Sequence, residues 1–204
     1  SETVTHARTA VDRYGDAYRI RRRNRRGGGD DPRIAVVDSQ AVSLGLGLLA
    51  AAAAEEAREG KSLDEVRAYV EGLIPALRIF FAVDSLAYLQ RSGRLGRGRA
   101  VVGSMLGLRP ILGVRHGEVI HVDQVRGEKG IPAALADWIA WSLDDPAAPL
   151  RLGVMHADAP DRAERLAAAL ESRFDCRRTT ISQIGPVVGA HCGPGTVGAA
   201  VLPA

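Results

Sequence analysis

The chain has few of the residues on which several protein classes depend. Its 204 residues include only two cysteines, Cys176 and Cys192, which excludes a disulfide framework and a cysteine-rich zinc site. The longest apolar run covers residues 41–54 and is interrupted by Ser43 and two glycines, so it is too short to cross a bilayer. No charged segment followed by an apolar one opens the chain. We therefore expect no secretory signal, no transmembrane segment and a cytoplasmic location.

Aromatic residues and lysine are scarce as well. Aromatic side chains make up 4% of the chain, and none lies between Tyr88 and Trp138. Proteins that bind single-stranded nucleic acid interleave aromatic side chains with positive charge, so we expect no specific nucleic-acid binding. Lys61 and Lys129 are the only lysines among 27 basic residues, and the formal net charge is only +3. Several arginines gather between residues 19 and 26, and the alternative function is a basic adaptor that uses this tract to bind nucleic acid or an anionic surface.

The composition that remains is that of a globular protein, with 46% hydrophobic and 25% charged residues. In the first third, apolar spacing predicts a short helix over residues 4–14, and the arginine tract with its glycines predicts an exposed loop. The β-branched run over residues 33–38 is typical of a buried parallel strand. An alanine-rich helix is expected to end at Gly60, and a capping signal at Ser62 predicts a helix to Leu73.

The pattern changes after residue 76. We predict strands over 78–83, 110–114, 119–126, 150–156, 177–181 and 199–202, with helices over 85–90, 132–143 and 161–174. The two strands around residues 116–118 form a hairpin. The fold class is therefore α/β with two lobes: residues 1–76 as the remainder of a parallel α/β lobe, and residues 77–204 as an α+β lobe with a mixed sheet.

Two segments are rich in groups that bind anions. Glycines and two prolines surround His191 in residues 184–198, where backbone N–H groups and an imidazole could meet a carboxylate or phosphate. The alternative is a tight loop with a surface histidine. Residues 91–99 mix arginine and glycine, which suits phosphate contact but is more typical of a solvated basic loop. Nucleotide-binding and serine-hydrolase motifs are missing, and the histidine spacing predicts no metal site, so we expect no catalytic centre.

Four motifs in order resemble the DegV family of bacterial fatty-acid-binding proteins. They are Val37–Gly47 (VDSQAVSLGLG), Phe81–Leu95 (FAVDSLAYLQRSGRL), Leu108–Leu112 (LRPIL) and Gly189–Gly195 (GAHCGPG). Cys192 stands where the family usually has threonine. The family's first part has no counterpart in this chain, so the resemblance implies a member that lacks its N-terminal part.

The resemblance implies a function as well as a fold. Such proteins hold a long-chain fatty acid between two α/β lobes and present its carboxylate to an ATP-dependent kinase subunit, which forms an acyl phosphate for phospholipid synthesis. It implies that the chain is a binding subunit without a cofactor of its own, its ligand being the fatty acid. His191 and, at a weaker match, Ser1 are implied at the carboxylate. Arg94 and Arg126 are implied to face the kinase subunit.

An acyl chain requires an aliphatic slot with one polar end. The candidates for its wall are Leu95, Val101, Val102, Leu106, Leu108, Ile111 and Leu112. The alternative for each of them is an ordinary position in the hydrophobic core.

Overall fold

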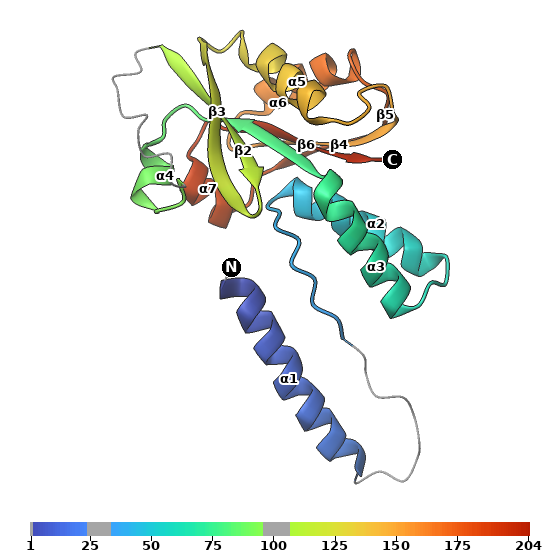
Figure 1. Ribbon diagram of the computed structural model, residues 1–204. Helices are drawn as coiled ribbons and strands as arrows, with labels where there is room; N and C mark the ends of the chain where they lie inside the picture. Colours follow the sequence, from blue (N-terminus) through green and yellow to red (C-terminus); the bar gives the residue numbers. More distant parts are fainter. Residues whose placement is uncertain (1, 24–33, 96–106) are drawn as a thin grey trace.

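A six-stranded sheet forms the centre of the computed structural model, which describes residues 2–23, 34–95 and 107–204. Helices cover both faces of the sheet (Figure 1). In spatial order the strands are β3 (Glu118–Arg126), β2 (Leu108–Arg115), β1 (Arg78–Ala82), β6 (Val197–Pro203), β4 (Leu150–His156) and β5 (Cys176–Gln183). The described helices are α1 (Glu2–Arg23), α2 (Leu44–Arg58), α3 (Leu63–Leu73), α4 (Ala87–Arg91), α5 (Ile131–Ser142), α6 (Pro160–Glu171) and α7 (Pro186–Cys192), with a 3-10 turn over Ile74–Ala76.

The sheet is mixed, as the sequence predicts. Strands β4 and β5 run parallel and are joined through α6, whereas the other neighbouring pairs are antiparallel. The β2–β3 hairpin turns at His116 and Gly117, and both have positive φ angles, 52° and 76°. Positive φ angles at both turn residues give the turn a twist that matches the twist of the two strands. Glycine adopts such angles most easily, so short hairpins favour it there.

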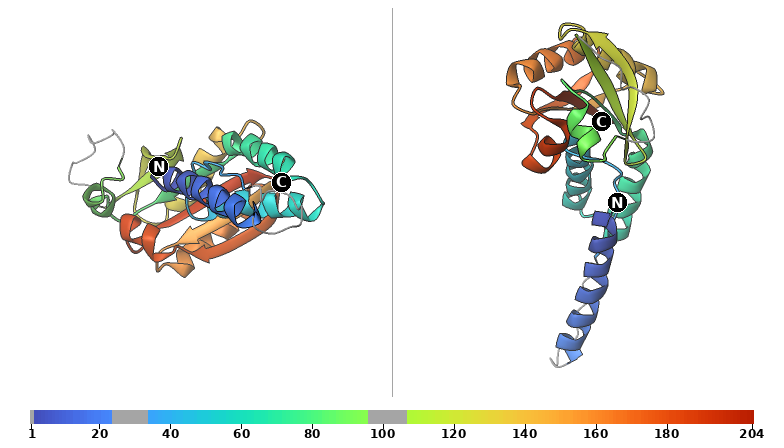
Figure 2. Two further views of the ribbon diagram at one scale, coloured as in Figure 1. Left: turned by 90° about the horizontal axis from the view of Figure 1, so that it is seen from below. Right: turned by 90° about the vertical axis from the view of Figure 1, so that its left-hand side faces the viewer.

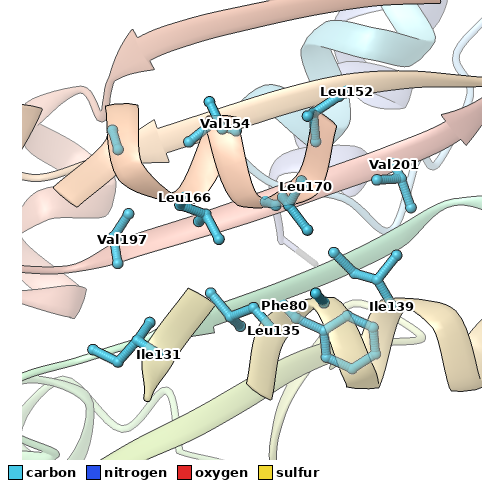
Figure 3. Close-up of a cluster of buried hydrophobic side chains, with 14 of the residues drawn as sticks. Phe80, Ile131, Leu135, Ile139, Leu152, Val154, Leu166, Leu170, Val197 and Val201 are labelled. Atoms are coloured by element: carbon cyan, nitrogen blue, oxygen red, sulfur yellow. The ribbon is translucent and has the colours of Figure 1, made fainter. Parts of the chain in front are cut away.

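One face of the sheet is covered by α5 and α6, and we call it the α5/α6 face. Its core takes alternate residues from the strands, such as Phe80 and Ala82 of β1 and Val197 of β6. Figure 3 shows Leu135 and Ile139 of α5 and the leucines of α6 directed at these strands. The apolar spacing of both helices explains the arrangement, because residues three and four apart share a helix face.

The opposite face is covered by two separate pairs of helices, and we call it the α2/α7 face. Helix α2 covers β4 and β6, and α3 packs against α2; the α2 cluster between them and the sheet includes Leu49, Ile79 and Leu202. Helices α4 and α7 cover the other half. Their cluster, the α7 cluster, contains Phe81, Val83, Leu86, Leu89, Leu112 and Cys192. Val114 and Val188 are half-buried and pack against both clusters.

Local signals explain the helix boundaries near residue 60. Gly60 has a φ of 85° just after α2, the left-handed conformation in which helices commonly end. Ser62 and Glu65 form a reciprocal capping box at the start of α3: the Ser62 N–H donates to Glu65 Oε2, and the Glu65 N–H donates to Ser62 Oγ. The hydrogen bonds from Ser62 also lower the pKa of the Glu65 carboxyl.

The strand predicted over residues 33–38 is wrong for the part that the structure describes. Residues 34–43 contain no strand, and Ile34 is 48% exposed. A strand needs a neighbour for its backbone hydrogen bonds, and no described segment pairs with these residues. Val37 and Ala41 instead lie against the α2 cluster. The β-branched run therefore leads into α2 as extended chain.

The N-terminal helix is longer than its apolar spacing predicts. Helix α1 continues through Arg23, so the loop predicted from residue 19 onward is wrong as far as that residue. Arginine is a good helix former, which is enough to continue a helix that has already begun. Arg25 and Arg26 lie outside the described residues. In Figures 1 and 2, α1 extends away from the sheet.

The division of the chain at residue 76 stays a prediction. Helix α2 packs against β4 and β6, so the elements on both sides of that boundary share one sheet. Within the described ranges, every helix is too short or too polar to cross a bilayer.

Candidate functional site

His191 lies in the last turn of a short helix rather than in the glycine loop that the sequence predicts. Pro186 occupies the first turn of α7, where its missing N–H costs nothing, and Gly193 ends the helix with a φ of 81°. The side chain of His191 is half-buried. Its Nδ1 atom is buried and has no hydrogen-bond partner.

The chain just after His191 is held tightly. A Cβ atom at Gly193 would lie 2.5 Å from Cδ2 of Tyr88, so the tyrosine ring packs directly on this glycine. The buried Thr196 hydroxyl lies 2.9 Å from the Gly193 carbonyl and 3.1 Å from that of Cys192, and it bonds back to the end of α7. These contacts fix the direction in which α7 ends.

A charged network lies beside the same turn. Nη1 of Arg162 donates to Oδ1 of Asp84 at 2.8 Å and to the Gly195 carbonyl at 2.7 Å, while Nη2 lies 3.0 Å from Oε2 of Glu128. Nη1 of Arg109 lies 3.0 Å from the same Asp84 oxygen. Burial alone would lower the pKa of Arg162, but Asp84 and Glu128 outweigh it, and the pKa is raised.

Cys192, next to His191, occupies a buried apolar position. It is 8% exposed and belongs to the α7 cluster. Burial raises the pKa of its thiol to about 11, so the reactive thiolate is rare near neutral pH. His191 follows Val188 by three residues, so both lie on one face of α7, and Val188 packs against the α7 cluster. An imidazole beside aliphatic side chains has the chemistry to hold an amphipathic anion.

The structure brings two of the predicted wall residues, Leu95 and Leu112, to the α7 cluster. Leu95 is half-buried, packs against the α7 cluster and forms an isolated bridge with Val119 at the free edge of β3. Val119 and Val188 border the same cluster.

Three other predicted residues lie near the end of the β2–β3 hairpin or just after α4. Leu108 is half-buried and pairs with Arg126 where β2 begins and β3 ends. Arg126 is exposed, and so is Arg94, which follows α4. Neither arginine has an ion-pair partner among the described residues.

The structure does not bring Ile111 to His191. Ile111 is fully buried on the α5/α6 face, whereas the next residue, Leu112, belongs to the α7 cluster on the opposite face. Successive residues of a strand point to opposite faces, so Ile111 has the core position that was the alternative for these side chains. Ser1, Val101, Val102 and Leu106 lie outside the described residues.

Sequence reasoning did not single out His121 or Arg162. His121 lies directly opposite Leu112 across the hairpin, so both side chains point to the α2/α7 face, and the buried Nε2 atom of His121 has no hydrogen-bond partner. A histidine in an alternating strand gives no signal of its own. Arg162 meets Asp84 across 78 residues of sequence, a separation that no local spacing rule covers.

The six-stranded mixed sheet with helices on both faces defines an α/β protein. In particular, the chain belongs to the DegV family: the family model, described as an uncharacterised protein of the DegV family, matches residues 1–204. A DegV domain-containing protein of Caldanaerobacter subterraneus subsp. tengcongensis is 37% identical over 169 residues, which cover 83% of this chain and 60% of that protein. The chain thus spans about three fifths of that relative's length.

Solved structures agree on the fold. A DegV family protein from Thermus thermophilus, whose structure is described as fatty-acid binding, is 30% identical with a TM-score of 0.78; the match covers 85% of this chain and 62% of that one. A DegV family protein from Eubacterium eligens, loaded with heptadecanoic acid, has a TM-score of 0.86 over 100% of this chain and 69% of that one. Its identity is 17%, so this likeness shows the fold alone.

Proposed function

We propose that this chain is part of a DegV protein that binds a long-chain fatty acid, with the acyl carboxylate at His191. The observation that carries the proposal is the half-buried imidazole on α7, which follows Val188 by three residues and precedes Cys192, since Val188 packs against the α7 cluster and Cys192 belongs to it. The fatty-acid binding of the Thermus thermophilus relative supports it.

The surroundings of the His191 ring favour a role as hydrogen-bond donor to the carboxylate. Nδ1 is buried without a hydrogen-bond partner. An unprotonated nitrogen at that place destabilises the folded state less than an unsatisfied N–H group would. A neutral imidazole then carries its hydrogen on Nε2, from which it donates to a carboxylate oxygen. Ser1 is the second carboxylate contact that the family resemblance implies.

The acyl chain follows the α2/α7 face in this proposal. Leu95 forms part of the wall of the slot, and Leu106 and Leu108 stay candidates for it. Ile111 is excluded because it is buried in the core of the α5/α6 face. Val187 on α7 is 75% exposed and offers further apolar surface. About 15 methylenes at ~0.8 kcal/mol each give roughly 12 kcal/mol before the cost of association, enough for micromolar or tighter binding.

The complete protein, on this proposal, has two lobes and acts with a partner. Residues 1–76 belong to the first lobe and residues 77–204 form the second. The bound acid is presented to an ATP-dependent kinase subunit, which makes the acyl phosphate for phospholipid synthesis. Exposed Arg94 and Arg126, without ion-pair partners among the described residues, suit contact with that subunit and its phosphates. The chain supplies no catalytic group of its own.

The test compares two histidine variants of the delipidated chain by palmitate binding isotherms and thermal melts. His191→Ala should weaken binding by about 1–3 kcal/mol, the scale of a hydrogen bond to a charged group, and should leave the melt nearly unchanged. His116→Ala, at the exposed hairpin turn, is the matched control and should leave both unchanged. Parent chain that binds no fatty acid would refute the proposal, and unchanged affinity in His191→Ala would remove this residue from the site.

The partner role has its own test. Arg126→Ala should leave palmitate binding unchanged and slow acyl-phosphate formation when the kinase subunit is added. Equal loss of binding and of acyl-phosphate formation would place Arg126 at the pocket instead. ATP consumption by the chain with fatty acid alone would contradict the assignment as a binding subunit.

A further inference from the structure

Arg162 connects three parts of the molecule that are distant in sequence. Its guanidinium holds Asp84 just after β1, Glu128 just after β3 and the Gly195 carbonyl just before β6. The side chain of Arg162 is only 19% exposed, the least among the arginines of this network. Several fixed partners around a largely buried guanidinium hold it in one geometry, since its donors form a rigid fork. We call Arg162 with Asp84, Glu128 and Gly195 the Arg162 brace.

The brace acts on the turn that ends the His191 helix. Gly195 has a φ of 78°, and its N–H donates to the Ala157 carbonyl at 2.8 Å. The Gly195 carbonyl receives Arg162, and a Cβ atom at Gly195 would clash with the Asp84 carboxylate. Thr196, the next residue, bonds back to the last carbonyls of α7. Each link from Arg162 to the end of α7 is thus a hydrogen bond or a close contact.

We infer that Arg162 is a positioning residue for His191: by fixing Gly195 it sets where the end of α7 presents the imidazole to the acyl carboxylate. This inference rests on the proposed fatty-acid function. Arg162 itself touches neither the α7 cluster nor the His191 ring in any described contact. Its effect on binding must therefore pass through the turn after His191.

Arg165 supplies a matched control. It lies on the same helix, α6, and pairs with the same carboxylate, that of Glu128, but it makes no contact with Gly195 or Asp84. Its side chain is 58% exposed. Arg162→Gln and Arg165→Gln therefore remove the same charge from the same helix, and only the first releases the turn.

The affinity experiment is a double-mutant cycle on the delipidated chain with palmitate. Arg162→Gln should weaken binding about 5–10-fold, and Arg165→Gln should leave it within about twofold. In a His191→Ala background, Arg162→Gln should have no further effect, because the group it positions is gone. Additive losses would overturn the inference. Arg162→Lys is a milder variant that keeps the positive charge but loses the guanidinium donors. Its affinity for palmitate should lie between those of the parent chain and Arg162→Gln.

A second readout separates this inference from the proposed function. Imidazole proton and nitrogen NMR signals of His191 in the ligand-free chain report the ring environment directly. Arg162→Gln should shift or broaden them, and Arg165→Gln should not. Unmoved His191 signals would refute the positioning role even if palmitate binds, whereas a parent chain that binds no palmitate would refute the proposed function alone.

Discussion

The two faces of the sheet differ in how their hydrophobic cores are divided. On the α5/α6 face, two amphipathic helices lie side by side over one continuous core, and residues such as Leu135, Ile139 and Leu166 are fully buried. The α2/α7 face is divided between two smaller clusters, and it carries both of the buried imidazole nitrogens that lack partners in the described part of the chain. On the proposed function, the fatty acid lies against the divided α2/α7 face, and the continuous core of the α5/α6 face contributes mainly to stability.

The largest expected effect separates the faces by truncating one leucine on each. Leu166→Ala on the α5/α6 face should lower the free energy of unfolding by about 2–5 kcal/mol and leave palmitate affinity unchanged. Leu95→Ala, half-buried at the α7 cluster, should cost about 1 kcal/mol of stability and weaken palmitate binding roughly fivefold. Urea unfolding and binding isotherms measure both quantities. Equal stability losses would show that the α2/α7 face is closed as tightly as the other.

A second substitution tests how rigidly the binding face is held. Gly193→Ala places a methyl group against Tyr88 in a left-handed backbone, and it should destabilise the fold by about 2–4 kcal/mol. Gly127→Ala is the control, because Gly127 also has a positive φ, 70°, but a Cβ atom there meets nothing within 4 Å. Its cost should be the backbone strain alone, about 1 kcal/mol. Equal losses of unfolding free energy in the two variants, measured by urea unfolding, would mean that the Tyr88 ring moves aside easily. The turn after His191 would then not be tightly packed.

The buried thiol makes the stability of the α7 cluster depend on pH. Cys192 has a pKa raised from 9.0 to about 11 by burial, so the folded chain holds this proton more tightly than the unfolded chain. The stabilisation is complete below pH 9 and is lost as the pH rises toward 11, about 2 kcal/mol in all. Unfolding of the parent chain and of Cys192→Ala between pH 8 and 11 measures it: the difference between the two should shrink across this window. Parallel curves would show that the thiolate is as well accommodated in the fold as outside it.

The sequence predicts most elements of the sheet and its helices, because each carries a local signal. An apolar run marks β1 and another marks the middle of β4, and the Ser62–Glu65 box marks α3. The same kind of run fails over residues 33–38, since a strand also requires a neighbour and no periodicity reveals whether one exists. Helix α7 escapes prediction for the opposite reason: its glycines signal a loop, while packing against α4 and the cap at Gly193 favour a helix.

The candidate site is predictable only in part. His191 stands out because glycines and a family motif surround it. The Arg162 brace does not, because its members come from four separate segments and only the fold brings them together. His121 is hidden for a different reason: its register against Leu112 decides which face it points to, and a bulge in the hairpin near residue 111 shifts that register.

The smallest expected effect concerns His121, and it tests whether the α2/α7 face keeps polar groups at the expense of stability. Its Nε2 atom is buried without a partner beside aliphatic side chains, and an unsatisfied buried nitrogen destabilises the folded state. His121→Leu keeps an apolar side chain of similar size and removes that nitrogen, so the free energy of unfolding should rise by about 1 kcal/mol. His116→Leu at the exposed turn controls for the loss of an imidazole in general and should change stability by less than about 0.5 kcal/mol. Chemical unfolding of the three proteins at one pH measures the difference. A loss of stability in His121→Leu would mean that the imidazole makes a favourable interaction on this face, and the contrast between the two faces would then rest on His191 alone.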